Sequence, residues 1–172
     1  MSSAEALQQQ YRVVVCQAPL GVEPALISYE PDEWTREDGG TSLRTWSTGR
    51  AFTTRPPEPV KVFIDEGEGG VLTPLHVSVL WLVSRELVAA LRAAGVHNLE
   101  VFDAEVTDFN QGGEVLRTHH AVNVVGVGSL EAMHALGLRC FKLDTGGLVV
   151  HDSVRLALEA SGIPMLEFHV LR

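Results

Sequence analysis

Hydrophobic and polar residues follow a regular pattern mainly in the second part of the chain, residues 71–172. Over residues 85–94, the apolar positions recur at helical spacing and define one hydrophobic face. Ser84 precedes this stretch as a potential N-cap, and Gly95 follows it as a residue that ends helices. The pattern therefore predicts a helix over residues 85–94.

Two more helices are predicted by the same signals. Ser129 is expected to cap a short helix that runs through Leu136 and is closed by Gly137. Asp152 is expected to cap a longer helix that ends at residue 161, just before Gly162.

Strands are predicted where short apolar runs lie between turn-forming residues. Residues 115–127 are apolar on both faces, which predicts one long strand in the centre of a sheet. The two glycines at the end of the segment 144–147 accept the positive φ of a tight turn and predict a hairpin. The remaining strands expected in this part are residues 99–106, 139–143, 148–150 and 166–170.

The first part of the chain, residues 1–70, is rich in proline, glycine and other turn formers. It contains three short strand-like runs at residues 12–16, 25–29 and 60–64, which favour loops and edge strands over a core. Together the patterns predict a single α+β domain over residues 1–172. It would have a mixed β-sheet, two or three packed helices and an irregular N-terminal third.

The regular part contains a possible internal repeat. Residues 82–100 align without gaps on residues 149–167, and the aligned pairs include Val83 with Val150 and Gly95 with Gly162. A gene duplication would produce this match, and so would convergence of two helix–glycine–strand units on one pattern. The sequence leaves both explanations open.

The charge of the chain restricts its partners. The 172 residues include 13 Lys and Arg against 22 Asp and Glu, which gives a formal net charge of −9. This balance argues against binding to nucleic acid or to an anionic membrane surface, both of which require basic residues. A basic protein partner is compatible with it, as is a protein with no charged partner.

The two cysteines, Cys16 and Cys140, each lie in an apolar run, which predicts buried, reduced thiols. Residues 1–12 carry no secretory signal, and the longest apolar run, residues 77–83, is too short to span a bilayer. We therefore expect a soluble, cytoplasmic protein with no cofactor and no metal ion.

Enzymatic signatures are weak. Residues 125–129 resemble a phosphate-binding turn but lack its third glycine, and a capped strand–helix turn explains them equally well. His119 and His120 are adjacent in a predicted strand and so point to opposite faces. Either one with Asp103, or Cys140 as a nucleophile, defines the enzymatic alternative.

Acidic and aromatic residues in the first part of the chain favour protein binding instead. Aromatic side chains surrounded by carboxylates suit the recognition of a basic protein surface. The predicted partner-binding residues are Tyr29, Glu30, Asp32, Glu33, Trp34, Glu37, Asp38, Trp46, Asp65, Glu66 and Glu68.

The second part of the chain resembles a family of bacterial immunity proteins of polymorphic toxin systems, the family numbered eleven, found in myxobacteria and their relatives. The resemblance covers about residues 60–172. It rests on the following segments: residues 82–84 at the start of a helix, 91–96 at its end, 98–102, 123–126, 141–143 and 149–152, then Gly162 and 166–168. These motifs are structural, and no catalytic residue is carried over from the family.

This resemblance implies a protein that binds and occludes a cognate toxin, for example a basic nuclease, without catalysing a reaction. Two alternatives stay open. One is a small cytoplasmic enzyme with a His/Asp or Cys site, and the other is a homo-oligomeric scaffold without a toxin partner. The sequence does not determine the oligomeric state.

Overall fold

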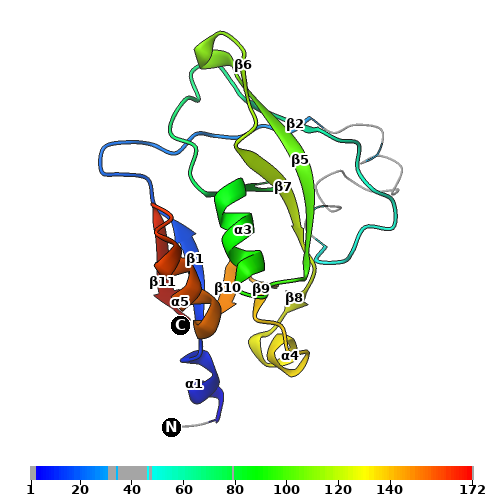
Figure 1. Cartoon of the computed structure of the whole chain (residues 1–172), viewed down its shortest axis with the longest axis vertical. Coiled ribbons are helices and arrows are strands. Elements are labelled where there is room, and N and C mark those ends of the chain that lie inside the picture. The colour runs from blue at the N-terminus through cyan, green and yellow to red at the C-terminus, as the bar shows by residue number, and fades with distance from the viewer. Residues whose placement is uncertain (1–2, 31–33, 35–45, 47, 79, 172) are drawn as a thin grey trace.

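The structure is a computed structural model that describes residues 3–30, 34, 46, 48–78 and 80–171. Its described residues form an α+β fold with two mixed sheets, as the sequence pattern predicted for the fold class (Figure 1). The prediction had a single sheet, and the second sheet is a correction. It arises because the chain leaves one sheet after residue 124 and joins the other at residue 127.

The five-stranded sheet has the order β11-β1-β10-β9-β8. All neighbours are antiparallel except β8 and β9, which run parallel. Its strands are β1 (Tyr11–Cys16), β8 (Val127–Gly128), β9 (Cys140–Leu143), β10 (Leu148–His151) and β11 (Leu166–Val170).

The six-stranded sheet has the order β2-β5-β7-β4-β3, and β6 pairs with β5 beyond this path. Strand β2 runs parallel to β5, whereas the other pairs are antiparallel. Its strands are β2 (Val60–Ile64), β3 (Leu75–Val77), β4 (Trp81–Ser84), β5 (Leu99–Asp108), β6 (Glu114–Leu116) and β7 (His119–Val124).

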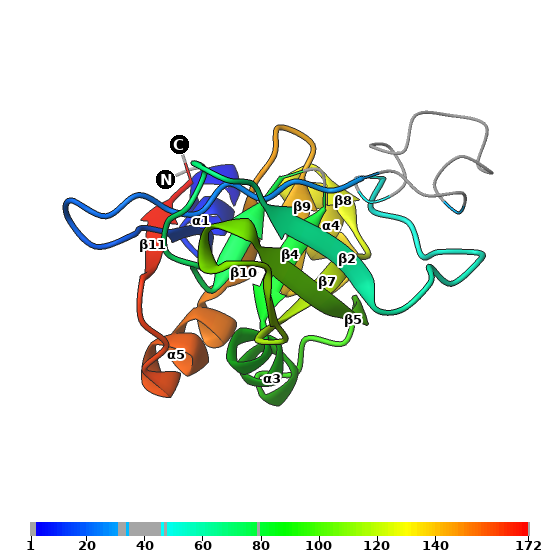
Figure 2. The same ribbon diagram turned by 90° about the horizontal axis from the view of Figure 1, so that it is seen from above.

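The helices are α1 (Ser3–Gln8), α3 (Arg85–Ala93), α4 (Leu130–Ala135) and α5 (Asp152–Ser161), with a 3₁₀ turn η2 (Phe109–Gln111). Helices α3 and α5 lie side by side on one side of the sheets, at the bottom of the view in Figure 2. Leu87 and Leu91 of α3 pack with Leu158 of α5 and with residues from both sheets, so one hydrophobic core joins the two sheets.

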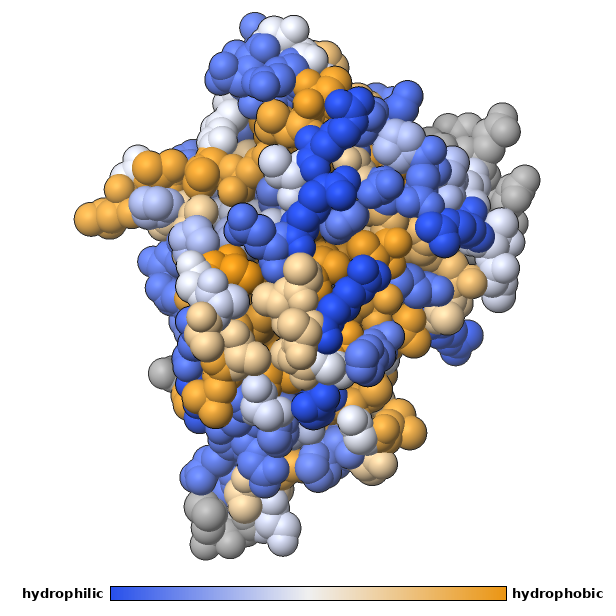
Figure 3. All heavy atoms as spheres, viewed as in Figure 1, coloured by the Kyte–Doolittle hydropathy of each residue, from blue (hydrophilic) through white to orange (hydrophobic). Residues whose placement is uncertain are grey.

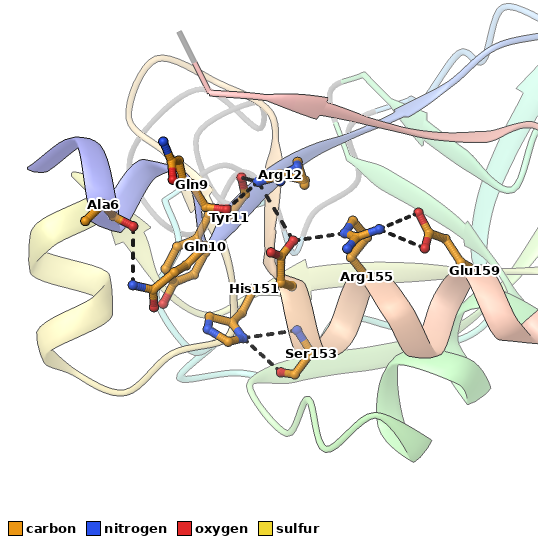
Figure 4. A network of polar contacts seen from close by, with 10 residues as sticks. Ala6, Gln9, Gln10, Tyr11, Arg12, His151, Ser153, Arg155 and Glu159 are labelled. Atoms are coloured by element: carbon orange, nitrogen blue, oxygen red, sulfur yellow. Dashed lines mark hydrogen bonds and ion pairs between the residues drawn. The ribbon is translucent and has the colours of Figure 1, made fainter. Parts of the chain in front are cut away.

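The predicted N-cap residues of α3 and α4 are confirmed, but the predicted N-cap of α5 is not. Ser84 accepts a hydrogen bond from Leu87 N, and Ser129 accepts one from Ala132 N, as expected for N-caps. Asp152 was the predicted cap of α5, and this is wrong. His151 is the N-cap because its Nδ1 accepts from Ser153 N (Figure 4), and Asp152 is the first helical residue.

The predicted long strand over residues 115–127 is also wrong, since it is divided into β6, β7 and β8. Gly126 has a φ of 124°, which turns the chain out of the six-stranded sheet. The side chain of Asn98 stabilises this crossing by donating to Val125 O and to Cys140 O, at 2.7 and 2.8 Å. Only β7 is central, as the pattern predicted.

The strand-like run at residues 25–29 is not a strand. It contributes one isolated bridge, with Ser28 opposite Phe63, and Pro24 just before the run forms another with Val71. Ser28 exchanges two backbone hydrogen bonds with Phe63 of β2, but Leu26 N donates to Glu68 O in the loop after β2, so the ladder does not continue along this segment. The predicted hairpin is confirmed, because β9 and β10 pair across a turn in which Gly146 and Gly147 have positive φ.

The two aligned segments of the possible repeat adopt the same arrangement. Each forms a strand, a helix and a second strand, and an antiparallel third strand lies between the two. The three-strand orders are β4-β7-β5 and β10-β1-β11, and their registers agree when residues 67 positions apart are matched. For example, His120 of β7 is paired with Val83 and with Asp103 in the first arrangement. Arg12 of β1 is paired in the same way with Val150 and with Val170 in the second. The middle strand follows the unit in the first case and precedes it in the second.

Candidate protein-binding surface

Two loops leave the six-stranded sheet together because β2 and β5 are parallel and end at the same level. Ile64, the last residue of β2, is paired with Asp108, the last residue of β5. The loop after β2 therefore begins beside η2, which follows β5. This juxtaposition brings together two acidic segments that are far apart in the sequence.

Asn110 connects the two loops through its side chain. Its amide donates to Asp65 O at 3.0 Å, and its Oδ1 accepts from Gly67 N at 2.9 Å. Asp108 in turn caps η2 by accepting from Asn110 N at 2.9 Å, while Ser28 Oγ donates to Asp65 Oδ2 at 2.6 Å. These bonds fix the backbone from which the carboxylates project.

Exposed apolar side chains lie among these carboxylates. The ring of Phe109 stacks on Phe63 with a centroid separation of 6.0 Å, yet Phe109 remains 49% exposed. Leu26 is 61% exposed and is held there because its N–H donates to Glu68 O. We define the acidic tip as these apolar residues with the nearby carboxylates: Leu26, Phe63, Asp65, Glu66, Glu68, Asp108, Phe109 and Glu114.

The acidic tip occupies the end of the molecule that carries β6 in Figure 1. In Figure 3 this end is hydrophilic at its extremity and has hydrophobic atoms directly beside it. No Lys or Arg occurs in residues 62–84 or 93–116, the two stretches that supply most of the tip. The local charge is therefore strongly negative, and a basic surface with an apolar centre would complement it.

The predicted aromatic anchors occupy a different region. Trp46 is only 3% exposed and packs edge-on against Trp34, Phe52 and Phe102. Tyr29 contacts the same ring, and Trp34 Nε1 donates to Thr54 O. This cluster covers the outer face of the six-stranded sheet, so burial assigns Trp46 to the core and leaves it unavailable as a contact residue.

The predicted acidic residues divide between the tip and other places. Asp65, Glu66 and Glu68 are exposed members of the tip. Glu30 is exposed but lies away from it, because the Ser28–Phe63 bridge is antiparallel and carries the chain toward the start of β2. The other four predicted carboxylates, Asp32, Glu33, Glu37 and Asp38, lie outside the described residues.

Sequence reasoning missed the contribution of residues 108–114 to this surface. Asp108 and Glu114 were not candidates, since nothing in their spacing relates them to residues 65–68. The signal that identifies them is the parallel register of β2 and β5, which pairs Ile64 with Asp108.

Two of the residues that define the enzymatic alternative, His120 and Asp103, lie close together in the structure. His120 Nδ1 lies 3.5 Å from Asp103 Oδ1, which also receives a bond from Arg85 at 3.2 Å. Glu58 accepts from Asp103 N at 2.7 Å and pairs with Arg55, and these contacts lower the pKa of Glu58. Burial and the Arg85 charge lower the pKa of His120 and favour its neutral form.

A cavity of about 280 Å³ adjoins this network and is lined by Glu58, Pro59, Arg85, Asp103, Ala104, Glu105 and Arg117. The cations that line it have carboxylate partners, because Arg85 pairs with Asp103 and Arg117 with Glu105. His119 does not join them, because it points to the other face and its Nε2 donates to Thr73 O at 2.9 Å.

Neither thiol is placed for nucleophilic chemistry. Cys140 is fully buried in the five-stranded sheet, and burial raises its pKa to about 12. Burial likewise raises the pKa of Cys16 to about 11. Both remain protonated near neutral pH, and the thiolate is the reactive form.

Within the described residues, no group of three or more His, Cys, Asp or Glu side chains is arranged to hold a metal ion. No helix in this part of the chain is both long enough and apolar enough to cross a membrane. Comparison with known proteins adds no relative, since the chain matches no protein-family model and no curated protein is significantly similar to it.

Proposed function

We propose that this protein is a toxin-neutralising immunity protein that binds its cognate toxin through the acidic tip. It acts by recognition and occlusion, without turnover and without a cofactor. The single observation that carries the proposal is the tip itself, where exposed Leu26 and Phe109 lie among carboxylates in a region without Lys or Arg. The sequence resemblance to immunity proteins supports the same function.

The chemistry of the tip specifies the kind of partner. Five carboxylates belong to it, and Asn110 and Ser28 hold the backbone of its two loops. A basic nuclease domain presents cations to bind phosphates, and the carboxylates would occupy those positions in place of nucleic acid. Phe109 and Leu26 would then be desolvated at the centre of the contact and slow dissociation.

Co-expression with the protein encoded next to this one tests the proposal. We expect the neighbour to be toxic alone, and its toxicity to be relieved by this protein through a stable stoichiometric complex. Toxicity without rescue and without a complex would contradict the proposal.

Charge reversal then locates the binding surface. The variant E66K/E68K should lose rescue and complex formation, because it places cations against a basic partner. The matched control E86K/E131K makes the same change in net charge at exposed positions on α3 and α4. If both double variants rescue equally, the tip is not the binding surface.

One observation favours an enzymatic function as the second candidate: His120 lies close to Asp103 beside a cavity. The variant H120Q separates the two functions. It should preserve toxin neutralisation fully if the protein acts by binding, whereas loss of protection with an intact complex would favour catalysis.

A further inference from the structure

The edge strand β11 is open on one side. It is the outermost strand of the five-stranded sheet, and among the described residues only β1 pairs with it (Figure 1). Glu167, His169 and Val170 are exposed. Open edge strands are templates for the addition of another strand, and proteins commonly protect them.

The register determines which backbone groups face outward. Gln17 N donates to Met165 O, so the pair 17/165 is a hydrogen-bonded pair of the antiparallel ladder with β1. Because bonded pairs alternate, residues 167 and 169 also direct their backbone groups toward β1. Leu166, Phe168 and Val170 therefore present their N–H and C=O groups to the open edge.

Strand β5 corresponds to β11 in the two aligned segments, and it shows how such an edge is covered. Asp103 occupies in β5 the position that Val170 occupies in β11, and its N–H donates to Glu58 Oε2 at 2.7 Å. Phe52 N also bonds to the side chain of Glu100, so residues 52–58 run along that edge. No described residue performs this function for β11.

The side chains of β11 are self-complementary about Phe168. If two β11 strands pair antiparallel around a twofold axis at this residue, Leu166 lies opposite Val170 of the second copy. Glu167 then lies opposite His169 of the second copy, in the non-hydrogen-bonded pairs where side chains are closest. Apolar residues face apolar residues, and acidic residues face histidines.

We propose that β11 is a homodimerisation edge, and that two copies of this chain join their five-stranded sheets through it. The occupant is a second copy because its strand matches both polar positions at once. A purely acidic strand would leave Glu167 opposite another carboxylate, whereas a second copy offers it a histidine ring nitrogen, the same kind of partner that Glu167 has in its own strand at 3.0 Å from His169 Nε2. Closed dimers with a twofold axis are also the commonest protein assemblies.

A groove beside the edge adds apolar surface to this contact. It has a volume of about 500 Å³ and lies between α5 and β11, where Leu158, Ile163, Leu166 and Phe168 provide its apolar lining. Phe168 of each copy would meet at the twofold axis on this face of the sheet, as a cross-strand aromatic pair. The contact therefore combines backbone hydrogen bonds with burial of partly exposed hydrophobic residues.

The test is sedimentation or light scattering of the full chain over a roughly hundredfold concentration range. We expect a reversible dimer of the wild type. The variant H169E places glutamates opposite each other twice and should raise the dissociation constant about tenfold or more. The charge exchange E167K/H169E restores opposite charges and should restore dimerisation. The control H97E makes the same change in net charge at an exposed site outside β11 and should have no effect.

Two further variants test the register. V170P removes one outward N–H without touching the bonds to β1, and should weaken the dimer while the circular dichroism spectrum stays native. E167C/H169C should give an intermolecular disulfide under mild oxidation, because non-hydrogen-bonded pairs have Cα atoms about 4.5 Å apart. The pair E167C/H97C should not.

A chain that stays monomeric at every concentration overturns the proposal. So does a dimer that neither H169E nor V170P weakens, since its interface would lie elsewhere. The variant E66K/E68K leaves β11 unchanged and should dimerise like the wild type, so this inference and the proposed function fail independently.

Discussion

At the scale of single residues, Asn110 connects the two loops of the acidic tip. It is neither charged nor apolar, but its side chain bonds to Asp65 O, to Gly67 N and to the carboxylate of Asp108. A carboxylate on a disordered loop loses conformational entropy when it binds a partner. A carboxylate on an ordered loop loses less conformational entropy on binding. In the proposed complex, Asn110 would therefore favour binding without contacting the partner.

Substituting Asn110→Ala should lower the free energy of unfolding by about 1–2 kcal/mol, because it removes several partly exposed hydrogen bonds. It should also weaken the complex with the cognate toxin. Urea denaturation and titration calorimetry measure the two effects. Asn110→Asp keeps the acceptor and loses the amide donor, so it should fall between the wild type and Asn110→Ala. Equal affinities for all three proteins would show that the order of the loops is irrelevant.

His76 gives a residue-scale prediction about pH. Burial lowers its pKa to about 4, and its Nε2 accepts from Thr73 N at 2.8 Å. The unfolded chain binds the proton at the ordinary histidine pKa, so it binds more protons than the folded chain between that value and about 4. Stability is therefore complete above the ordinary pKa and is lost as the pH falls.

We expect the free energy of unfolding to fall by about 2 kcal/mol between about pH 7 and pH 5 from this group. Burial also lowers the pKa of His119, which acts in the same direction. Chemical denaturation at several pH values measures the slope. His76→Gln keeps an acceptor for Thr73 N but cannot titrate, so a slope that is the same as in the wild type would contradict this assignment.

At the scale of elements, the described residues between β1 and β2 contact the six-stranded sheet mainly through aromatic rings, and their bridges to other segments are isolated. Trp46 contacts Phe102 of β5 and Phe52, and Arg55 lies over the Phe102 ring at 5.2 Å. Ring packing of this kind depends on shape and buried area and is independent of backbone register. This explains how a segment with weak periodicity still covers one face of a sheet.

Trp46→Ala should destabilise the protein by about 3–5 kcal/mol, because it leaves a cavity under this segment. Trp46→Phe should cost much less, since it keeps a ring and removes an Nε1 that has no hydrogen-bond partner among the described residues. Thermal unfolding measures both effects. If Trp46→Phe folds normally and yet loses toxin binding, Trp46 acts as a contact residue after all.

At the scale of the whole molecule, the distribution of charge matters more than the net value of −9. The regions beside the His120 network and α5 contain arginines paired with carboxylates, such as Arg117 with Glu105 and Arg155 with Glu159. Residues 62–84 and 93–116, which supply most of the tip, contain no Lys or Arg, and Lys61 and Arg117 lie just outside these stretches. The unbalanced negative field therefore extends from one end of the molecule and would steer a basic partner toward it.

The association rate with the cognate toxin should fall about tenfold or more as the ionic strength rises from about 0.05 to 0.5 M, because salt screens this field. The dissociation rate should change little. Stopped-flow measurements give both rates. E66K/E68K should show a weaker salt dependence than E86K/E131K, and an association rate that is independent of salt would remove electrostatic steering from the mechanism.

The sequence by itself determined the local structure of this protein. Helix starts and ends, the β9–β10 hairpin and several strands depend on interactions between neighbouring residues, such as the cap at Ser84 and the positive φ at Gly95. The α+β class followed from these elements. At the start of α5 two adjacent residues could serve as the cap, and the local signal selected Asp152 where the structure has His151.

Only the tertiary structure decided which distant segments meet. The division of residues 115–127 between two sheets depends on Asn98 and on the bend at Gly126. The acidic tip exists because β2 pairs with β5 in parallel, and the open edge exists because β1 occupies only one side of β11. Strand pairing is a non-local interaction, and a single sequence carries little information about which strands become neighbours.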